Sequence, residues 1–252
     1  MQAVMELAKR KPLLPSKGQR PRRRIADFLI VGCGLRRLHD TRFQSVIRAV
    51  LDEIDLQYVR DNHPCRDCAD RSELYRVVQS SVIGDEPIDF LEFGVFRGDS
   101  LREWSALNQH AESRFYGFDS FEGLPDAWRK GQGKGHFDVD GAMPKIADDR
   151  VNLIKGWFDE TIPDFVRSFT PKNRLLLHLD ADLYSSTLVP LVYFARYLQA
   201  GSLVIFDEFY DRNHEFKAFQ DFLKISKHRY RLVCQMENYA KVCIELLGRP
   251  VT

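Results

Sequence analysis

The chain has 252 residues, a formal net charge of +1 and 44% hydrophobic residues. A chain of this length and apolar content can bury one substantial core, so a single catalytic domain is expected. The near-zero net charge does not indicate a nucleic-acid-binding protein, because such proteins carry an extended basic surface.

The first predicted region is a basic arm over residues 1–40, in which ten Lys and Arg residues stand against three acidic ones. Its run KRKPLLPSKGQRPRRR (9–24) combines like charges with Pro and Gly, which is typical of a partly disordered segment. The apolar stretch FLIVGCGL (28–35) is too short for a transmembrane helix, which needs about 20 apolar residues. The start of the chain does not have the pattern of a secretory signal, and five cysteines are a poor disulfide framework. We therefore expect no transmembrane segment, and a cytoplasmic protein with reduced thiols.

A helical cover on the acceptor side of the site is predicted over residues 41–84. Apolar residues recur at three- and four-residue steps from Phe43 to Ile54, the pattern of an amphipathic helix. A second helix is predicted over about 70–83, where Gly84 ends it. The nearby HPCRDC motif has the spacing of half a zinc site, but no second Cys or His pair follows at a suitable distance, so zinc is not expected.

From residue 85 to 252 short apolar runs alternate with helical segments, which predicts the catalytic domain. The runs are IDFLEF (88–93), RFYGFD (114–119), VNLIKG (151–156), RLLLHLD (174–180) and SLVIFDEF (202–209). Such alternation is typical of an α/β fold with a doubly wound, mostly parallel sheet. The chain closes with YRLVCQM and YAKVCIELL, separated by two residues, which indicates a hairpin and an antiparallel edge strand. The predicted sheet has seven strands.

Ligands of open α/β sheets bind beyond the carboxyl ends of the strands, and EFGVFRGDS follows the first of these runs. Gly94 and Gly98 permit a sharp turn and a close approach of a ligand to backbone amides. Glu92 before them disfavours a pyrophosphate and favours a cationic group. Asp119, 25 residues beyond Gly94, ends the next run, where an acid can accept both hydroxyls of a ribose. A nucleoside with a cationic tail fits this pattern.

Further acids end two later runs, Asp180 and Asp182 in LHLDADLYSST and Asp207 with Glu208 in FDEF. Close carboxylates repel one another unless a cation intervenes, so such a group of acids argues against a simple binding module. Asp182, two residues after Asp180, is expected to cap the following helix.

The combination of motifs resembles class I S-adenosylmethionine-dependent methyltransferases and, more narrowly, the macrocin O-methyltransferase (TylF-type) family. The resemblance runs from about residue 74 to the last strand through FLEFGVFRGDS, GFDSFEGLP, GWFDETIP, LHLDADLYSSTL and VIFDE. It implies a Rossmann-like methyltransferase fold and a Mg2+-dependent transfer of a methyl group from S-adenosylmethionine to a hydroxyl. The acceptor would be a sugar or a glycosylated natural product.

The resemblance also implies site residues. It assigns Mg2+ or another divalent cation to Asp180, Asp207 and Glu208, although the family commonly has Asp at the last position. Asp180 is expected to act as metal ligand and base. His136, in the Gly-rich segment KGQGKGHFDVDG that is expected to form a lid, is a second catalytic candidate. The residues expected at the S-adenosylmethionine site are Glu92, Gly94, Gly98, Ser100, Asp119, Ser120, Trp157 and Phe158.

Three other functions remain possible from the sequence. The same metal chemistry would serve a catechol-type phenol O-methyltransferase. The Asp180-Ala-Asp182 sequence alone matches the DxD motif of metal-dependent glycosyltransferases, and a non-enzymatic adaptor with a basic arm is the third. The expected partners are a small-molecule acceptor with hydroxyl groups and no nucleic acid, and the cover helices and arm allow a homo-oligomer.

Overall fold

The computed structural model describes residue 59 and residues 65–249. Residues 65–249 belong to one compact unit, Arg60–Thr252. The predicted basic arm and the amphipathic helix expected from residue 41 lie outside the described residues, and the predicted boundaries at 40 and 84 stay predictions. No described helix combines the length and apolar character that crossing a bilayer requires.

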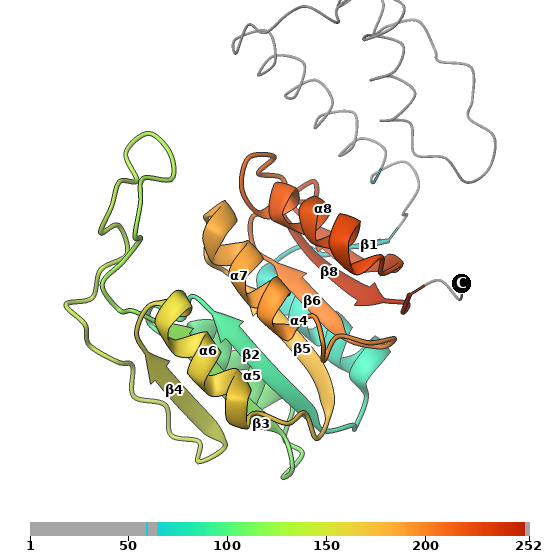
Figure 1. The fold of residues 1–252 in the computed structure, drawn as a ribbon. Coiled ribbons are helices and arrows are strands. Elements are labelled where there is room, and N and C mark those ends of the chain that lie inside the picture. The colour runs from blue at the N-terminus through green and yellow to red at the C-terminus, as the bar shows by residue number, and fades with distance from the viewer. Residues whose placement is uncertain (1–58, 60–64, 250–252) are drawn as a thin grey trace, which may run out of the picture. The chain divides into compact units, whose positions relative to one another are not determined.

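Strands and helices alternate along this unit (Figure 1). The strands are β1 (Arg66–Asp67), β2 (Ile88–Phe93), β3 (Arg114–Asp119), β4 (Val151–Lys155), β5 (Arg174–Leu179), β6 (Leu203–Phe206), β7 (Tyr230–Met236) and β8 (Lys241–Leu246). The helices are α4 (Arg71–Val78), the π-helical η3 (Gln79–Ile83), α5 (Asp99–Leu107), α6 (Phe158–Ser168), α7 (Tyr184–Phe194) and α8 (Glu215–Ser226).

All of these strands form one sheet in the order β1-β7-β8-β6-β5-β2-β3-β4. The neighbours from β6 to β4 pair in parallel, whereas β8 runs antiparallel to both β6 and β7. Helices α6, α7 and α8 cover one face, and α4 and α5 cover the other (Figure 1). The predicted α/β fold, with a mostly parallel doubly wound sheet and an antiparallel hairpin toward one edge, is confirmed. The sheet has one strand more than predicted, because the two-residue β1, too short for a hydrophobic pattern, pairs with β7.

The helix predicted over 70–83 is present as α4 followed by η3. Asp70 caps it by accepting a 2.7 Å hydrogen bond from the amide of Glu73, and Glu73 accepts one from the amide of Ala69 at 2.7 Å. These bonds satisfy amides that have no partner within the helix. Gly84, at φ 62°, ends the segment. The fixed start of α4 determines where its first residue, Arg71, projects.

The central strand β2 is buried over its whole length, including two acids. Asp89, near its beginning, accepts two hydrogen bonds from Arg114, at 2.8 and 2.5 Å. This pairing satisfies a charge that would otherwise be costly to bury. Glu92, near its end, forms no ion pair with an arginine or lysine of the described residues, and it belongs to the site described below. The four described cysteines, Cys65, Cys68, Cys234 and Cys243, are free thiols.

Candidate active site

A pocket of about 680 Å³ lies beyond the carboxyl ends of β2, β3, β5 and β6. This is where an open α/β sheet is expected to bind its ligand. Nine of the predicted site residues line it: Gly94, Ser100, Asp119, Ser120, Trp157, Phe158, Asp180, Asp207 and Glu208. Glu92, Gly98 and His136 are not among its lining residues.

The turn after β2 depends on glycine at position 94. Gly94 has φ 96°, and a Cβ atom there would lie 1.8 Å from the backbone oxygen of Asp180. The amide of Asp180 donates to the backbone oxygen of Phe93 at 3.0 Å. Only a residue without a side chain lets these two strand ends approach so closely. Gly98 has φ 77° and is the N-cap residue of α5, so it ends this turn without lining the pocket.

Glu92 lies behind the pocket wall in a buried hydrogen-bonded chain. Its Oε1 accepts a short hydrogen bond from Ser100 Oγ and lies 2.8 Å from His178 Nδ1. The other ring nitrogen of His178 is 3.3 Å from the hydroxyl of Tyr75. Among the described residues Glu92 Oε2 has no hydrogen-bond partner. The carboxylate of Glu92 therefore presents its negative charge from beneath the turn, and the hydroxyl of Ser100 is directed to it.

Asp119 connects the ends of β2 and β3. Its Oδ2 accepts hydrogen bonds from the amides of Val95 and Phe96, both at 2.8 Å, and its Oδ1 accepts one from the amide of Phe121 at 2.7 Å. A carboxylate has about four acceptor positions, so Asp119 still has capacity for a ligand hydroxyl.

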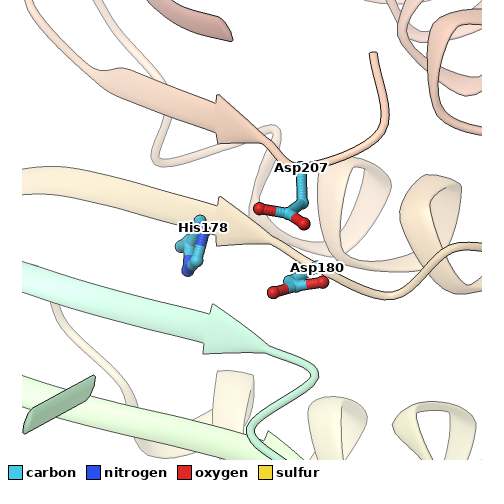
Figure 2. A group of neighbouring side chains, drawn as sticks. All are labelled: His178, Asp180 and Asp207. Atoms are coloured by element: carbon cyan, nitrogen blue, oxygen red, sulfur yellow. The ribbon is translucent and has the colours of Figure 1, made fainter. Parts of the chain in front are cut away.

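Three titratable side chains meet at the ends of β5 and β6. One ligand atom each of His178, Asp180 and Asp207 lies within 4.8 Å of the others, and Figure 2 shows the two carboxylates beyond the strand ends with His178 beside them. Burial and then the charge of Asp207 raise the pKa of Asp180 well above its usual value, against the opposing effect of Arg71. Glu208 does not belong to this group, although it lines the pocket.

Asp182 lines the pocket and does not cap α7, which corrects the expectation from sequence. The helix begins after Leu183, whose own side chain does not cap it, and the amide of its first residue, Tyr184, donates to His214 Nδ1 at 3.1 Å. Asp182 has a left-handed backbone with φ 58°, which turns its side chain to the pocket. Burial and the charges of Glu208 and Asp207 raise the pKa of Asp182 to about 7.

Two cations that sequence analysis missed contact Asp207. Nη2 of Arg71 lies 3.0 Å from each carboxylate oxygen of Asp207 and 3.7 Å from Oδ2 of Asp180. Lys241 Nζ forms a short ion pair with Asp207 Oδ2 and lies 3.2 Å from its backbone oxygen. Arg71 begins a helix far from Asp207 in sequence, and nothing local distinguishes it from other arginines.

The long segment between β3 and β4 contacts the segment after β6 at the pocket. Trp128 Nε1 donates to Asp211 Oδ2 at 3.1 Å, and Arg129 donates to the hydroxyl of Tyr210 at 2.9 Å. Trp128 and Arg129 both line the pocket.

His136, in the same segment, does not line the pocket. Its Nε2 lies 3.3 Å from the side-chain nitrogen of Gln132, and its ring packs on Phe137, which does line the pocket. This position gives no support to a catalytic role of His136, because its imidazole contacts another side chain of the segment and is not at the pocket surface.

The fold and the pocket define the class of protein. The structure of the O-methyltransferase NovP is similar with a TM-score of 0.56 at 23% identity, covering 71% of this chain and 80% of that chain. The structure of CalS11, a calicheamicin methyltransferase, is similar with a TM-score of 0.52 at 21% identity, covering 92% of this chain and 99% of that one. These similarities show a Rossmann-like methyltransferase fold.

The sequence identifies the family. The family model for macrocin O-methyltransferase (TylF) matches residues 69–233, and the chain belongs to this family. One relative, a tetracenomycin 4'-O-methyltransferase from Streptomyces olivaceus that acts on a dimethoxy-rhamnosyl compound, is 29% identical over 52% of this chain. A demethyldecarbamoylnovobiocin O-methyltransferase from Streptomyces niveus is 27% identical over 55% of it. The matched parts span 57% and 60% of these relatives' own lengths.

Proposed function

We propose that this protein transfers a methyl group from S-adenosylmethionine to a hydroxyl of a sugar or glycosylated natural product, with Mg2+ or another divalent cation as cofactor. The observation that carries the proposal is that one pocket holds both the glycine turn with Asp119 and the Asp180–Asp207 pair. The names of the two relatives, both O-methyltransferases of sugar-bearing compounds or their derivatives, support the choice of acceptor. A cytoplasmic location and a homo-oligomeric state stay predictions.

The donor half of the pocket consists of Gly94, Asp119, Ser120, Trp157 and Phe158. Asp119 would accept the ribose hydroxyls, and the turn at Gly94 would let the methionine part approach backbone amides. The rings of Trp157 and Phe158 would pack on the adenine, which suits their position on the pocket wall. Behind the turn, the buried charge of Glu92 favours a cationic ligand group, which the donor supplies as its sulfonium and ammonium.

The acidic half consists of Asp180, Asp182, Asp207 and Glu208. Carboxylate oxygens are the donors that Mg2+ prefers, and those of Asp180 and Asp207 lie close enough to fit one ion. A bound divalent cation would lower the pKa of an acceptor hydroxyl. Glu208, outside the close group, would line the acceptor site.

Asp180 would take the proton of the acceptor hydroxyl. As the oxygen attacks, the bond between it and the methyl carbon forms while the bond from that carbon to sulfur breaks, leaving S-adenosylhomocysteine. A carboxylate placed beside the acceptor hydroxyl can take its proton as the new bond forms. Holding the two reactants in line accounts for roughly 7–11 kcal/mol of barrier reduction in well-oriented reactions.

Calorimetric titration with S-adenosylhomocysteine, with and without Mg2+, tests the proposal. We expect the wild type to bind and Asp119→Asn to bind about tenfold or more weakly, since hydrogen bonds to a charged group contribute about 1.5–3 kcal/mol. Asp99→Asn is the matched control, because Asp99 also lines the pocket but pairs with Arg102 at 3.0 Å. Absence of binding by folded wild-type protein would refute the proposal.

A further inference from the structure

Arg71 has no part in the proposed reaction, yet it occupies the centre of the acidic half. A single guanidinium nitrogen, Nη2, lies 3.0 Å from both oxygens of Asp207 and 3.7 Å from an oxygen of Asp180. Three carboxylate oxygens thus surround one positively charged group. These two residues are also the ones that would hold a bound cation.

A divalent cation and Arg71 cannot share these oxygens. Mg2+ binds oxygen at about 2.0–2.1 Å and requires a nearly ideal octahedral arrangement of ligands. A nitrogen 3.0 Å from both oxygens of Asp207 stands on the approach to them. The two positive charges would also repel each other strongly in a partly buried site.

Lys241, the second cation on Asp207, is held differently. Its ammonium also contacts the backbone oxygen of Asp207, at 3.2 Å, and its side chain is 14% exposed. The side chain of Arg71 is 38% exposed and borders the pocket. The side chain of Arg71 can therefore move away from Asp207, whereas the side chain of Lys241 is held in place.

We propose that Arg71 is an internal counter-cation that competes with the divalent cation for Asp180 and Asp207. In the metal-free protein Arg71 holds the two carboxylates together, and metal binding requires its side chain to move into the pocket. This inference rests on the proposed function, because it takes the Asp180–Asp207 pair as the metal site. Only molecules in which Arg71 has left the pair can bind the metal. The apparent metal affinity is therefore lower than the intrinsic affinity in proportion to the fraction of such molecules.

Direct Mn2+ binding, measured by electron paramagnetic resonance on donor-free protein, tests the competition. We expect Arg71→Met to bind Mn2+ about tenfold or more tightly than the wild type, because the covered state is abolished. Arg71→Lys should fall between the two, since an ammonium keeps the charge but not the planar guanidinium. Thermal unfolding monitored by circular dichroism establishes that each variant is folded.

Arg129→Met is the matched control. Arg129 also lines the pocket and carries a positive charge, but its side chain contacts Tyr210, Trp128 and Gln132 rather than Asp180 or Asp207. Its removal should leave the Mn2+ affinity close to that of the wild type. If the Mn2+ affinity rose equally in Arg71→Met and Arg129→Met, the cause would be the loss of any positive charge at the pocket. The proposed competition by Arg71 would then be overturned.

The remaining outcomes separate this inference from the proposed function. Equal Mn2+ affinity in the wild type and Arg71→Met would overturn the role of Arg71 and leave the metal site standing. Failure of every variant to bind Mn2+ would overturn both the competition and the metal site. Titration of the same preparations with S-adenosylhomocysteine then establishes independently whether the donor half is intact.

Discussion

In the donor half of the pocket the backbone satisfies the key carboxylate, whereas in the acidic half distant side chains do so. Asp119 accepts hydrogen bonds from three amides that lie within 25 residues of it in sequence. Asp207 instead pairs with Arg71, 136 residues away, and with Lys241, 34 residues away. The position of Asp119 is set by backbone amides of its own motif and of the turn after β2. The charge around Asp207 depends on side chains from distant parts of the sequence, so it changes when one of them moves.

Gly94→Ala should have the largest effect, because Gly94 lies where the two halves meet. A Cβ atom 1.8 Å from the oxygen of Asp180 must displace the turn or the end of β5. We expect loss of S-adenosylhomocysteine binding and a fall of more than about 2 kcal/mol in the free energy of unfolding, measured in urea.

Gly84→Ala is the control for the strain of a positive φ alone. Gly84 has φ 62°, and no atom lies within 4 Å of an added Cβ. The expected cost is about 1–3 kcal/mol, without loss of donor binding. If the two variants behaved alike, the close contact of Gly94 with Asp180 would not matter for the pocket.

Asp180→Asn should impair the acidic half of the pocket and leave the donor half unchanged. Removing the proton acceptor should lower kcat about 100-fold or more, the lower range for general base catalysis, while S-adenosylhomocysteine affinity changes little. Asp126→Asn, at an exposed position on the pocket rim, serves as the control and should keep its activity. Full turnover by Asp180→Asn would exclude Asp180 as the base.

Glu215→Gln should have the smallest effect, on stability alone. Glu215 is fully buried at the start of α8, and burial raises its pKa well above the usual value. A carboxyl group with a raised folded-state pKa stabilises the fold below its unfolded pKa of about 4.3 and loses that contribution as the pH rises. The variant does not titrate, so its melting temperature should exceed that of the wild type increasingly with pH.

The gain should reach about 2–4 °C at mildly basic pH if removal of the charge is worth about 1 kcal/mol. The hydrogen bond that Oε2 of Glu215 accepts from the amide of Glu208, at 2.8 Å, can be kept by the glutamine oxygen. The exposed Glu112→Gln variant is the control and should show no such trend. A difference independent of pH would show that the charge of Glu215 is not the cause.

The donor half was predictable from sequence because its residues occur in short motifs at strand ends. Gly94 and Asp119 follow predicted strands directly, so the parallel sheet alone places them together. The same logic brought Asp180 and Asp207 to one edge, since β5 and β6 are neighbours. Gly84 marked the end of the helix predicted over 70–83, and two apolar runs separated by two residues predicted the closing hairpin.

Other features depend on long-range geometry or on backbone conformations that patterns do not encode. The pairing of Arg71 with Asp207 joins α4 to β6, and no local signal relates them. Asp182 was assigned to a helix cap because aspartate commonly caps helices, but its left-handed φ of 58° turns it to the pocket. His136 occurs in a Gly-rich segment next to a lining residue, and only the fold shows that its ring pairs with Gln132.

The most direct test of the proposed reaction is an assay with S-adenosylmethionine carrying an isotope-labelled methyl group. Purified protein and Mg2+ would be incubated with a panel of sugar-bearing natural products and a panel of catechols, and the products analysed by mass spectrometry. We expect label on a sugar hydroxyl, formation of S-adenosylhomocysteine, and loss of both in Asp180→Asn. Label found only on catechol hydroxyls, or no transfer to either panel by protein that binds S-adenosylhomocysteine, would contradict the proposed reaction.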